Sequence, residues 1–219
     1  MRIVVPPGVF RPRSDTWLLA DLIRAEERIP NSSVLDVCTG SGALAVAAAQ
    51  SGAGDVTAVD VSRRAVLTAW FNARLNGVRV RALQGDLFSP VARRPFDAIV
   101  SNPPYLPAEE EELPRRGSER AWDAGRNGRT LIDRIIAGAP SLLRPGGILL
   151  LIHSSLTGVD ATLERMRAAG LEGGEVTARR RGPLGPLLAA RVPELERRGL
   201  IEPGEREEEL VAVRAVRPG

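Results

Sequence analysis

Short strand-like runs that alternate with helical patterns constrain the fold of this chain more than any other feature. The runs cover residues 34–37, 56–61, 78–84, 96–101 and 147–152. The last of them is apolar throughout, which is typical of a strand that is buried on both faces of a parallel sheet. Helical patterns between the runs would cover those two faces. The alternation therefore predicts an α/β domain built on a mostly parallel sheet with helices on both faces.

Helical periodicity places the covering elements, and the tail of the chain completes the sheet. The expected helices are 14–28, 43–50, 63–76, 131–137 and 162–169. Residues 175–180 and 210–216 read as two more strands, and no helix of ordinary length fits between them. We therefore expect a seven-stranded sheet with an antiparallel C-terminal strand and an irregular insertion at 181–205. No repeat or long linker divides the chain, so 1–219 is predicted to be one domain that opens with an N-terminal segment and helix at 1–30.

Composition excludes several classes of protein. No stretch approaches the roughly 20 apolar residues of a membrane-spanning helix, and Pro6 and Pro7 interrupt the N-terminus too early for a signal peptide. One cysteine excludes an internal disulfide, and one histidine argues against a histidine-built metal site. The formal charge is only +3, which does not indicate the basic surface typical of nucleic-acid binding. We expect a cytoplasmic protein without a bound metal and without a membrane partner.

A glycine turn follows the first strand and predicts a nucleoside-binding site. Gly40 and Gly42 would let a ligand approach the backbone at the carboxyl end of the strand, where open α/β sheets bind ligands. Asp60 ends the second strand and can accept the hydroxyl hydrogens of a ribose. Asp86 follows the third strand and can accept an adenine amino group, while the Leu87 N–H donates to the ring. A plain tight turn is the alternative for the glycines alone, but acidic residues at successive strand ends favour a ligand site.

The sequence Asn102-Pro103-Pro104-Tyr105 follows the strand at 96–101 and predicts an acceptor-binding part of the same site. The Asn102 side-chain oxygen and the Pro103 carbonyl can accept the two hydrogens of a planar –NH2 group. The two prolines stiffen the turn, because proline restricts its own φ and the residue before it. Tyr105 can stack on a flat amide or base. The alternative is a proline-rich loop that only ends the strand.

Together these motifs resemble the HemK/PrmC-type family of S-adenosylmethionine-dependent methyltransferases, whose members methylate a glutamine side-chain amide in translation release factors. The resemblance includes residues 10–17 before the first helix. It also includes residues 121–129, which are similar to a segment of the short branch found in eukaryotes and archaea. The resemblance implies a Rossmann-like class I methyltransferase fold, with S-adenosyl-L-methionine as cofactor and S-adenosyl-L-homocysteine as product.

The same resemblance implies roles for individual residues. Asp36 would face the ammonium group of the cofactor, directly or through water. Cys38 stands where relatives carry glycine or cysteine, and a small buried packing residue is favoured over a reactive thiol. Thr16 would touch the cofactor together with Asp15, and a helix cap is the equal alternative for both. Asn102 is also expected to contact the cofactor from the acceptor side.

Three further groups of residues carry weaker predictions. His153 ends the fifth strand, where a solvated side chain is favoured over an acid–base group. Arg126, Asn127 and Arg129 form a polar loop that either contacts the substrate or cofactor as a lid or caps the following helix. Residues 179–181 and the loop after them are expected to help define the substrate pocket.

We therefore expect an N-methyltransferase that acts by in-line transfer, with a protein glutamine amide of a release-factor-like substrate as the favoured acceptor. An adenine or guanine amine of RNA or DNA and a small metabolite are the alternative acceptors. A non-catalytic cofactor-binding partner is disfavoured by the intact turn at Asn102. About thirty residues precede the first strand, so the N-terminal helical domain of bacterial members is not expected. The short branch commonly works with a small zinc-binding activator subunit, which is therefore a second expected partner.

Overall fold

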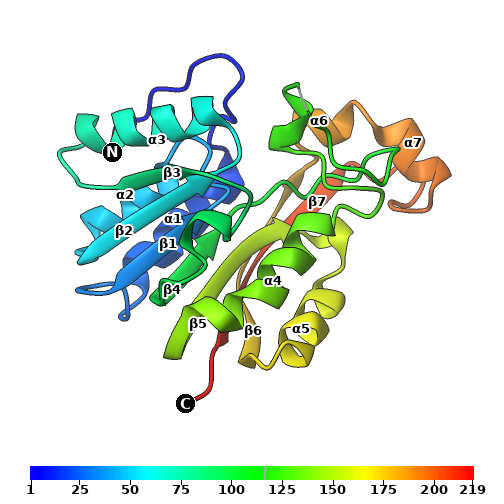
Figure 1. Cartoon of the computed structure of the whole chain (residues 1–219). Coiled ribbons are helices and arrows are strands. Elements are labelled where there is room, and N and C mark those ends of the chain that lie inside the picture. Colours follow the sequence, from blue (N-terminus) through cyan, green and yellow to red (C-terminus); the bar gives the residue numbers. More distant parts are fainter. Residues whose placement is uncertain (116) are drawn as a thin grey trace.

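The chain folds around one sheet of seven strands (Figure 1). The computed structural model describes residues 1–115 and 117–219. In sequence order the strands are Ser33–Val37 (β1), Asp55–Asp60 (β2), Arg81–Gln84 (β3), Phe96–Ser101 (β4), Leu143–Ser154 (β5), Glu172–Pro183 (β6) and Glu207–Val216 (β7). In space they run β3-β2-β1-β4-β5-β7-β6. The strands from β3 to β5 are parallel to their neighbours, and β7 is antiparallel to both β5 and β6. The predicted sheet is confirmed.

Helices cover both faces of the sheet, because successive residues of a strand point to opposite sides. The helices are Ser14–Ala25 (α1), Ala43–Gln50 (α2), Arg63–Leu75 (α3), Thr130–Leu142 (α4), Val159–Ala168 (α5), Pro186–Ala189 (α6) and Val192–Arg197 (α7). One core joins α1 and α2 to the face that carries Val34 and Val100. The other joins α4 and α5 to the face that carries Leu35 and Ile99. Within the described residues, no helix combines the length and the apolar character that crossing a membrane requires.

Most predicted elements begin or end a few residues away from the observed ones, and two of these differences have a clear local reason. The predicted strand 78–84 begins only at Arg81, because the Val78 N–H donates back to the Ala73 carbonyl (3.0 Å) and so completes the end of α3. The predicted helix 14–28 ends at Ala25, since the backbone of Glu26 is already extended. Neither change moves a strand end that faces the predicted site.

The connection between β6 and β7 forms a small unit of its own. The two strands pair as far as Pro183 and Glu207, so the insertion predicted at 181–205 occupies 184–206. It contains α6 and α7, and its apolar side chains pack into a third core together with Leu106 and Trp122. This core places the insertion against the segment that follows the Asn102 turn, above the sheet in Figure 1.

Candidate functional site

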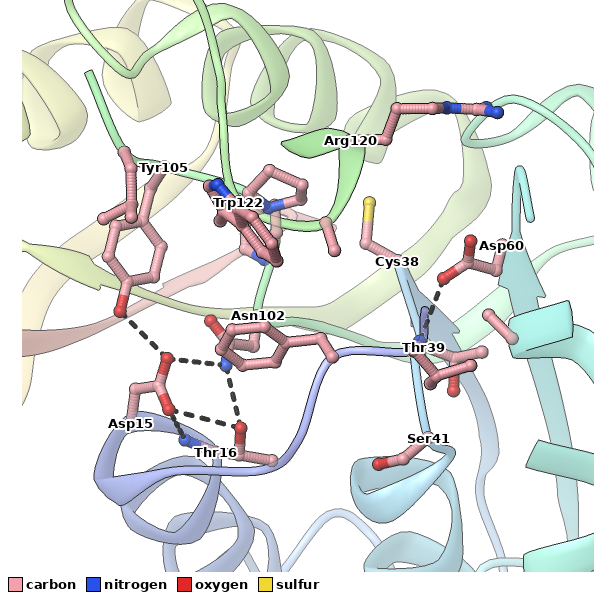
Figure 2. Close-up of a pocket in the computed structure, with 18 of the residues that line it drawn as sticks. Asp15, Thr16, Cys38, Thr39, Ser41, Asp60, Asn102, Tyr105, Arg120 and Trp122 are labelled. Carbon is pink, nitrogen blue, oxygen red and sulfur yellow. Dashed lines mark hydrogen bonds between the residues drawn. The ribbon is translucent and has the colours of Figure 1, made fainter. Parts of the chain in front are cut away.

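A pocket lies at the carboxyl ends of β1, β2 and β4 (Figure 2). After β1 the chain builds β2 and β3 on one side and then crosses to β4 on the other, and open α/β sheets bind ligands at such a switch point. The walls come from segments far apart in the sequence, namely 8–10, 12–16, 38–41, 59–62, 85–87, 102–106, 120–122 and 185–188, with Glu208 and Leu210. All predicted site residues except Asp36 and Gly42 line the pocket, namely Thr16, Cys38, Gly40, Asp60, Asp86, Leu87, Asn102, Pro103 and Tyr105.

The two glycines of the first turn have different reasons to be glycine. Gly40 lines the pocket with φ +53°, and a Cβ placed on it would meet no atom within 4 Å. The space beside Gly40 is therefore open to a ligand. Gly42 has φ +81°, and its Cβ would lie 2.7 Å from Ala69 Cα. The predicted reason for Gly42, close approach of a ligand, is thus replaced by close packing of the start of α2 on α3.

Asp36 lies beneath the pocket floor and is fully buried. Its Oδ2 accepts hydrogen bonds from the Thr39 hydroxyl (2.5 Å) and the Ala45 N–H (3.0 Å), and within the described residues its buried Oδ1 has no partner. Burial raises the pKa of this carboxyl to about 7. A buried carboxylate oxygen without a donor suits a nearby cationic group or a bridging water. Since Asp36 does not line the pocket, the geometry favours the water-mediated form of the predicted contact over the direct one.

Asp60 lines the pocket from the end of β2 and is oriented by the backbone. Its Oδ2 accepts from the Gly40 N–H (2.9 Å) and its Oδ1 from the Ser62 N–H (2.8 Å). Burial raises the pKa of this carboxyl, although the two backbone hydrogen bonds favour its charged form. Each oxygen keeps a free lone pair, so the group can still accept hydroxyl hydrogens while it holds the glycine turn in shape.

Two other strand ends carry unusual backbone conformations. Cys38 (φ +60°) and Leu87 (φ +47°) lie in the left-handed region, which side chains other than glycine rarely adopt. Such strain gathers at functional sites. Figure 2 shows the Cys38 sulfur beside the pocket, and burial, followed by the charge of Asp60, raises the pKa of the thiol well above its ordinary value. A neutral thiol supports the packing role that the sequence predicts, although Cys38 is half-buried. Asp86 lines the pocket and pairs with Arg134 (2.6 Å).

Asn102 is held at the centre of the acceptor side of the pocket (Figure 2). Its Nδ2 donates to Asp15 Oδ2 (3.0 Å) and to Thr16 Oγ1 (3.0 Å). A carboxylate only accepts hydrogen bonds, so Asp15 must face the –NH2 group of Asn102 and not its oxygen. The Asn102 Oδ1 is therefore left to accept a hydrogen bond from a ligand.

Asp15 and Thr16 have a role that the sequence did not reveal. The N-cap position of α1 belongs to Arg13, which makes no side-chain capping bond, so the predicted cap is wrong for both residues. Asp15 is buried and also accepts from the Tyr105 hydroxyl (2.9 Å). Burial, followed by the charge of Asp15, raises the pKa of Tyr105 well above its usual range. The phenol therefore stays protonated and keeps donating to Asp15.

The outer wall of the pocket includes Arg120, which sequence reasoning missed although it adjoins the segment 121–129 that carries the family resemblance. Trp122 lies within that segment. Residues 185–188 belong to the loop after 179–181, which was expected to help define the pocket. Ion pairs explain why residues 179–181 do not line the pocket. Arg179 pairs with Glu209 and Arg181 with Glu207. That part of the prediction is wrong, whereas the loop after those residues does reach the pocket.

Two further predictions are corrected by burial. His153 was expected to be solvated, but it is fully buried: β7 pairs beside it, and the Thr157 hydroxyl lies 2.9 Å from its Nδ1. Burial lowers the pKa of its imidazole to about 4.

Arg129 is also buried and donates to the carbonyl groups of Thr157 and Gly158. Arg126, Asn127 and Arg129 do not line the pocket, so the lid contact is wrong. Asn127 accepts from the Arg129 N–H (3.0 Å) just before α4, but Arg129 is the N-cap residue of this helix and no side chain makes a capping bond there.

Comparisons with known proteins identify the family. A family model described as "Methyltransferase small domain" matches residues 1–114. A Methanocaldococcus jannaschii protein, named provisionally as a protein N5-glutamine methyltransferase, is 34% identical over 188 residues, which cover 86% of this chain and 93% of the relative. The Mus musculus methyltransferase HEMK2 is 33% identical over 181 residues, with 80% and 85% covered. The release factor glutamine methyltransferase of Geobacter sulfurreducens is 39% identical over 154 residues, with 67% and 54% covered.

Solved methyltransferase structures share the fold. A methyltransferase from Pyrococcus furiosus superimposes with a TM-score of 0.66 at 17% identity and covers 99% of this chain and 89% of its own. The ribosomal protein L11 methylase of Lactobacillus delbrueckii subsp. bulgaricus gives 0.61 at 23% identity, with 96% and 83% covered. These similarities confirm the predicted class I methyltransferase fold. The chain belongs to the methyltransferase small domain family and is an S-adenosylmethionine-dependent methyltransferase of the HemK type.

Proposed function

We propose that this methyltransferase transfers a methyl group to the side-chain nitrogen of a glutamine in a protein, such as a release factor. The orientation of Asn102 supports the proposal. Both hydrogens of its amide are taken by Asp15 and Thr16, so its Oδ1 is available to a substrate group that donates, and a primary carboxamide offers two such hydrogens. Relatives named as glutamine methyltransferases, among them the release factor enzyme of Geobacter sulfurreducens, point to the same acceptor.

The cofactor side of the pocket fits S-adenosyl-L-methionine, which supplies an electrophilic methyl group on its sulfonium when bound. We assign the adenosyl and methionine portions to Gly40, Asp60, Asp86 and Leu87. The open space at Gly40 and the buried, unpartnered Oδ1 of Asp36 support this assignment. An ammonium group reached through one water would satisfy that oxygen.

The acceptor side supplies orientation and not a covalent nucleophile. A carboxamide nitrogen is a weak nucleophile, because its lone pair is delocalised into the carbonyl. Acceptors on its two hydrogens, the Asn102 Oδ1 and the Pro103 carbonyl, would draw electron density towards nitrogen and direct its lone pair. Alignment of this kind can lower a barrier by roughly 7–11 kcal/mol. As the new N–C bond forms, the S–C bond breaks, and the nitrogen then loses one proton to solvent.

A labelling experiment tests the acceptor class. Purified enzyme is given S-adenosyl-L-methionine with a tritiated methyl group and an extract of cells, and the product is divided between protease and nuclease treatment. We expect label that protease releases, and N5-methylglutamine on mass spectrometry after enzymatic digestion. Label released by nuclease, or label in small soluble compounds, would contradict the proposal and favour a nucleobase or a metabolite as acceptor.

The activator subunit stays a prediction. The described surface offers one place where large apolar side chains gather with helical spacing, on the outer face of α3: Leu67, Trp70, Phe71 and Leu75. We propose this face as the position of a partner subunit, beside the open edge of β3. Replacement of Trp70 by glutamate would then reduce copurification of a coexpressed activator without changing cofactor binding. A substrate in the translation machinery would also place the reaction in the cytoplasm.

A further inference from the structure

Polar atoms without partners mark a part of the pocket that neither the cofactor nor the carboxamide uses. Within the described residues, two buried side-chain atoms that lack a hydrogen-bond partner belong to residues that line the pocket: Trp122 Nε1 and Glu208 Oε2. One is a donor and the other an acceptor. Buried polar groups are almost always paired in native proteins, so an unpaired donor and an unpaired acceptor at one pocket indicate a ligand that supplies both partners.

Glu208 differs from the other carboxylates that line the pocket. Asp15 and Asp60 are occupied on both oxygens, and Asp86 pairs with Arg134. Glu208 Oε1 accepts from the Gly185 N–H (2.9 Å), which ties the start of β7 to the insertion. The Oε2 atom has no such partner. The Ser154 hydroxyl lies close enough to favour the charged form of Glu208 but makes no hydrogen bond of normal geometry with Oε2.

Trp122 contributes to another part of the pocket wall, which the loop after the Asn102 turn forms. Its ring packs with the insertion core, which fixes the indole in place, and Figure 2 shows it beside Asn102 and Tyr105. Burial raises the pKa of the Glu208 carboxyl, and the charge of Asp15 adds to the effect. The Trp122 N–H and the Glu208 carboxyl are therefore both shielded from water when no substrate is bound.

We propose that Trp122 and Glu208 bind the main chain of a protein acceptor next to the reacting carboxamide. The indole N–H donates to a backbone carbonyl, and the Glu208 carboxylate accepts a backbone N–H. This inference rests on the proposed function and deepens it, because a peptide unit offers one donor and one acceptor close together. An adenine amine or a free carboxamide lacks that pair beside its reacting nitrogen. Trp122 and Glu208 would therefore determine specificity for a residue within a polypeptide.

The test combines enzyme variants with modified ligands. The probe is N-acetyl-glutamine N-methylamide, and two analogues each replace one backbone N–H by an ester oxygen. Binding to the enzyme loaded with S-adenosyl-L-homocysteine is followed by NMR titration. We expect one of the two esters to bind wild type about 10-fold more weakly than the amide, because a hydrogen bond to a charged acceptor is lost. Glu208→Gln should lose the preference for the amide over that ester, since Gln can keep the Gly185 contact but presents an –NH2 donor in place of the acceptor Oε2.

Further variants separate recognition from folding. Trp122→Phe keeps an aromatic ring and removes the indole N–H. We expect it to lower the affinity for the amide probe about 5-fold without changing the affinity for S-adenosyl-L-homocysteine. Glu209→Gln, one residue away and paired with Arg179, is the matched control and should behave as wild type. Ser154→Ala tests whether Ser154 satisfies Glu208 instead of a ligand, and the preference for the amide should survive it.

Two outcomes would overturn the inference: equal binding of amide and esters by wild type, or the same preference in wild type and Glu208→Gln. Methyl transfer to the probe is measured separately. An amide preference that depends on Glu208, with no transfer to the probe, would sustain this inference and count against the proposed function.

Discussion

The cofactor side and the acceptor side of the pocket are built in different ways. On the cofactor side, functional groups follow successive strands, and neighbouring backbone holds them, as when the Gly40 N–H donates to Asp60 twenty residues away. On the acceptor side, Asn102 depends on Asp15, which lies 87 residues earlier, and the outer wall comes from an insertion near the C-terminus. The first arrangement follows from local chain geometry and the second from tertiary contacts. The two sides should therefore respond separately to substitution.

Replacement of Asn102 should give the largest separation. Asn102→Ala removes the oxygen that accepts from the substrate –NH2 group, and we expect methyl transfer to fall about 10³-fold, as for the loss of a preorganised polar group in other enzymes. The dissociation constant of S-adenosyl-L-homocysteine should stay within about 3-fold of wild type. Calorimetry and a methyl-transfer assay measure the two effects. Equal losses in both would show that the two sides are not separable.

Removal of Asp15 should act next most strongly, although Asp15 would not touch the acceptor. Asp15→Ala frees the Asn102 amide to rotate and leaves the Tyr105 hydroxyl without its partner. We expect kcat to fall about 10²-fold, because small errors of alignment are costly. Asp21→Ala on the exposed side of α1, where Asp21 pairs with Arg24, is the matched control. If Asp15→Ala keeps the kcat of wild type, Asp15 does not orient Asn102 for the reaction.

A pH titration sharpens the comparison on the cofactor side. Burial raises the pKa of Asp36 to about 7, so below that pH the carboxyl is protonated, and it must give up its proton before it can balance the cofactor ammonium. The affinity for S-adenosyl-L-homocysteine should then weaken as the pH falls, by about 10-fold between about pH 8 and about pH 6. Calorimetry across this range measures the slope. Asp36→Asn should bind with little dependence on pH, and an unchanged slope in this variant would assign the effect to another group.

The smallest expected effect concerns the insertion. Arg191 pairs with Asp123 (2.7 Å) and donates to the Pro107 carbonyl (2.8 Å), so it ties the insertion to the segment after the Asn102 turn. We expect Arg191→Ala to raise the acceptor KM about 5-fold, because the outer wall loses its brace, with unchanged cofactor affinity. Arg179→Ala, which breaks only an exposed pair with Glu209, serves as control. A KM equal to that of wild type would leave the insertion without a role in acceptor binding.

The same contrast explains what could be predicted from the sequence. The sheet and the strand-end residues Gly40, Asp60 and Asp86 could be predicted, because strand ends that follow one another in a parallel sheet meet at one edge. The partners of Asn102 could not, since no sequence pattern signals that Asp15 reaches across 87 residues. His153 was placed in solvent because the residues that bury it come from β7 and from Thr157, which a strand pattern does not reveal. The roles of Trp122 and Glu208 depend on the same kind of distant contact.

The central claim is that Asp15 acts on the acceptor through Asn102, whose oxygen it orients. A double-mutant cycle measures this directly, with transfer rates compared for wild type, Asp15→Ala, Asn102→Ala and the double variant. If the claim is right, Asp15→Ala causes no further loss once Asn102 has been replaced. If the transfer rate of the double variant instead falls by the product of the two single-variant factors, Asp15 acts independently of Asn102, and the account is contradicted.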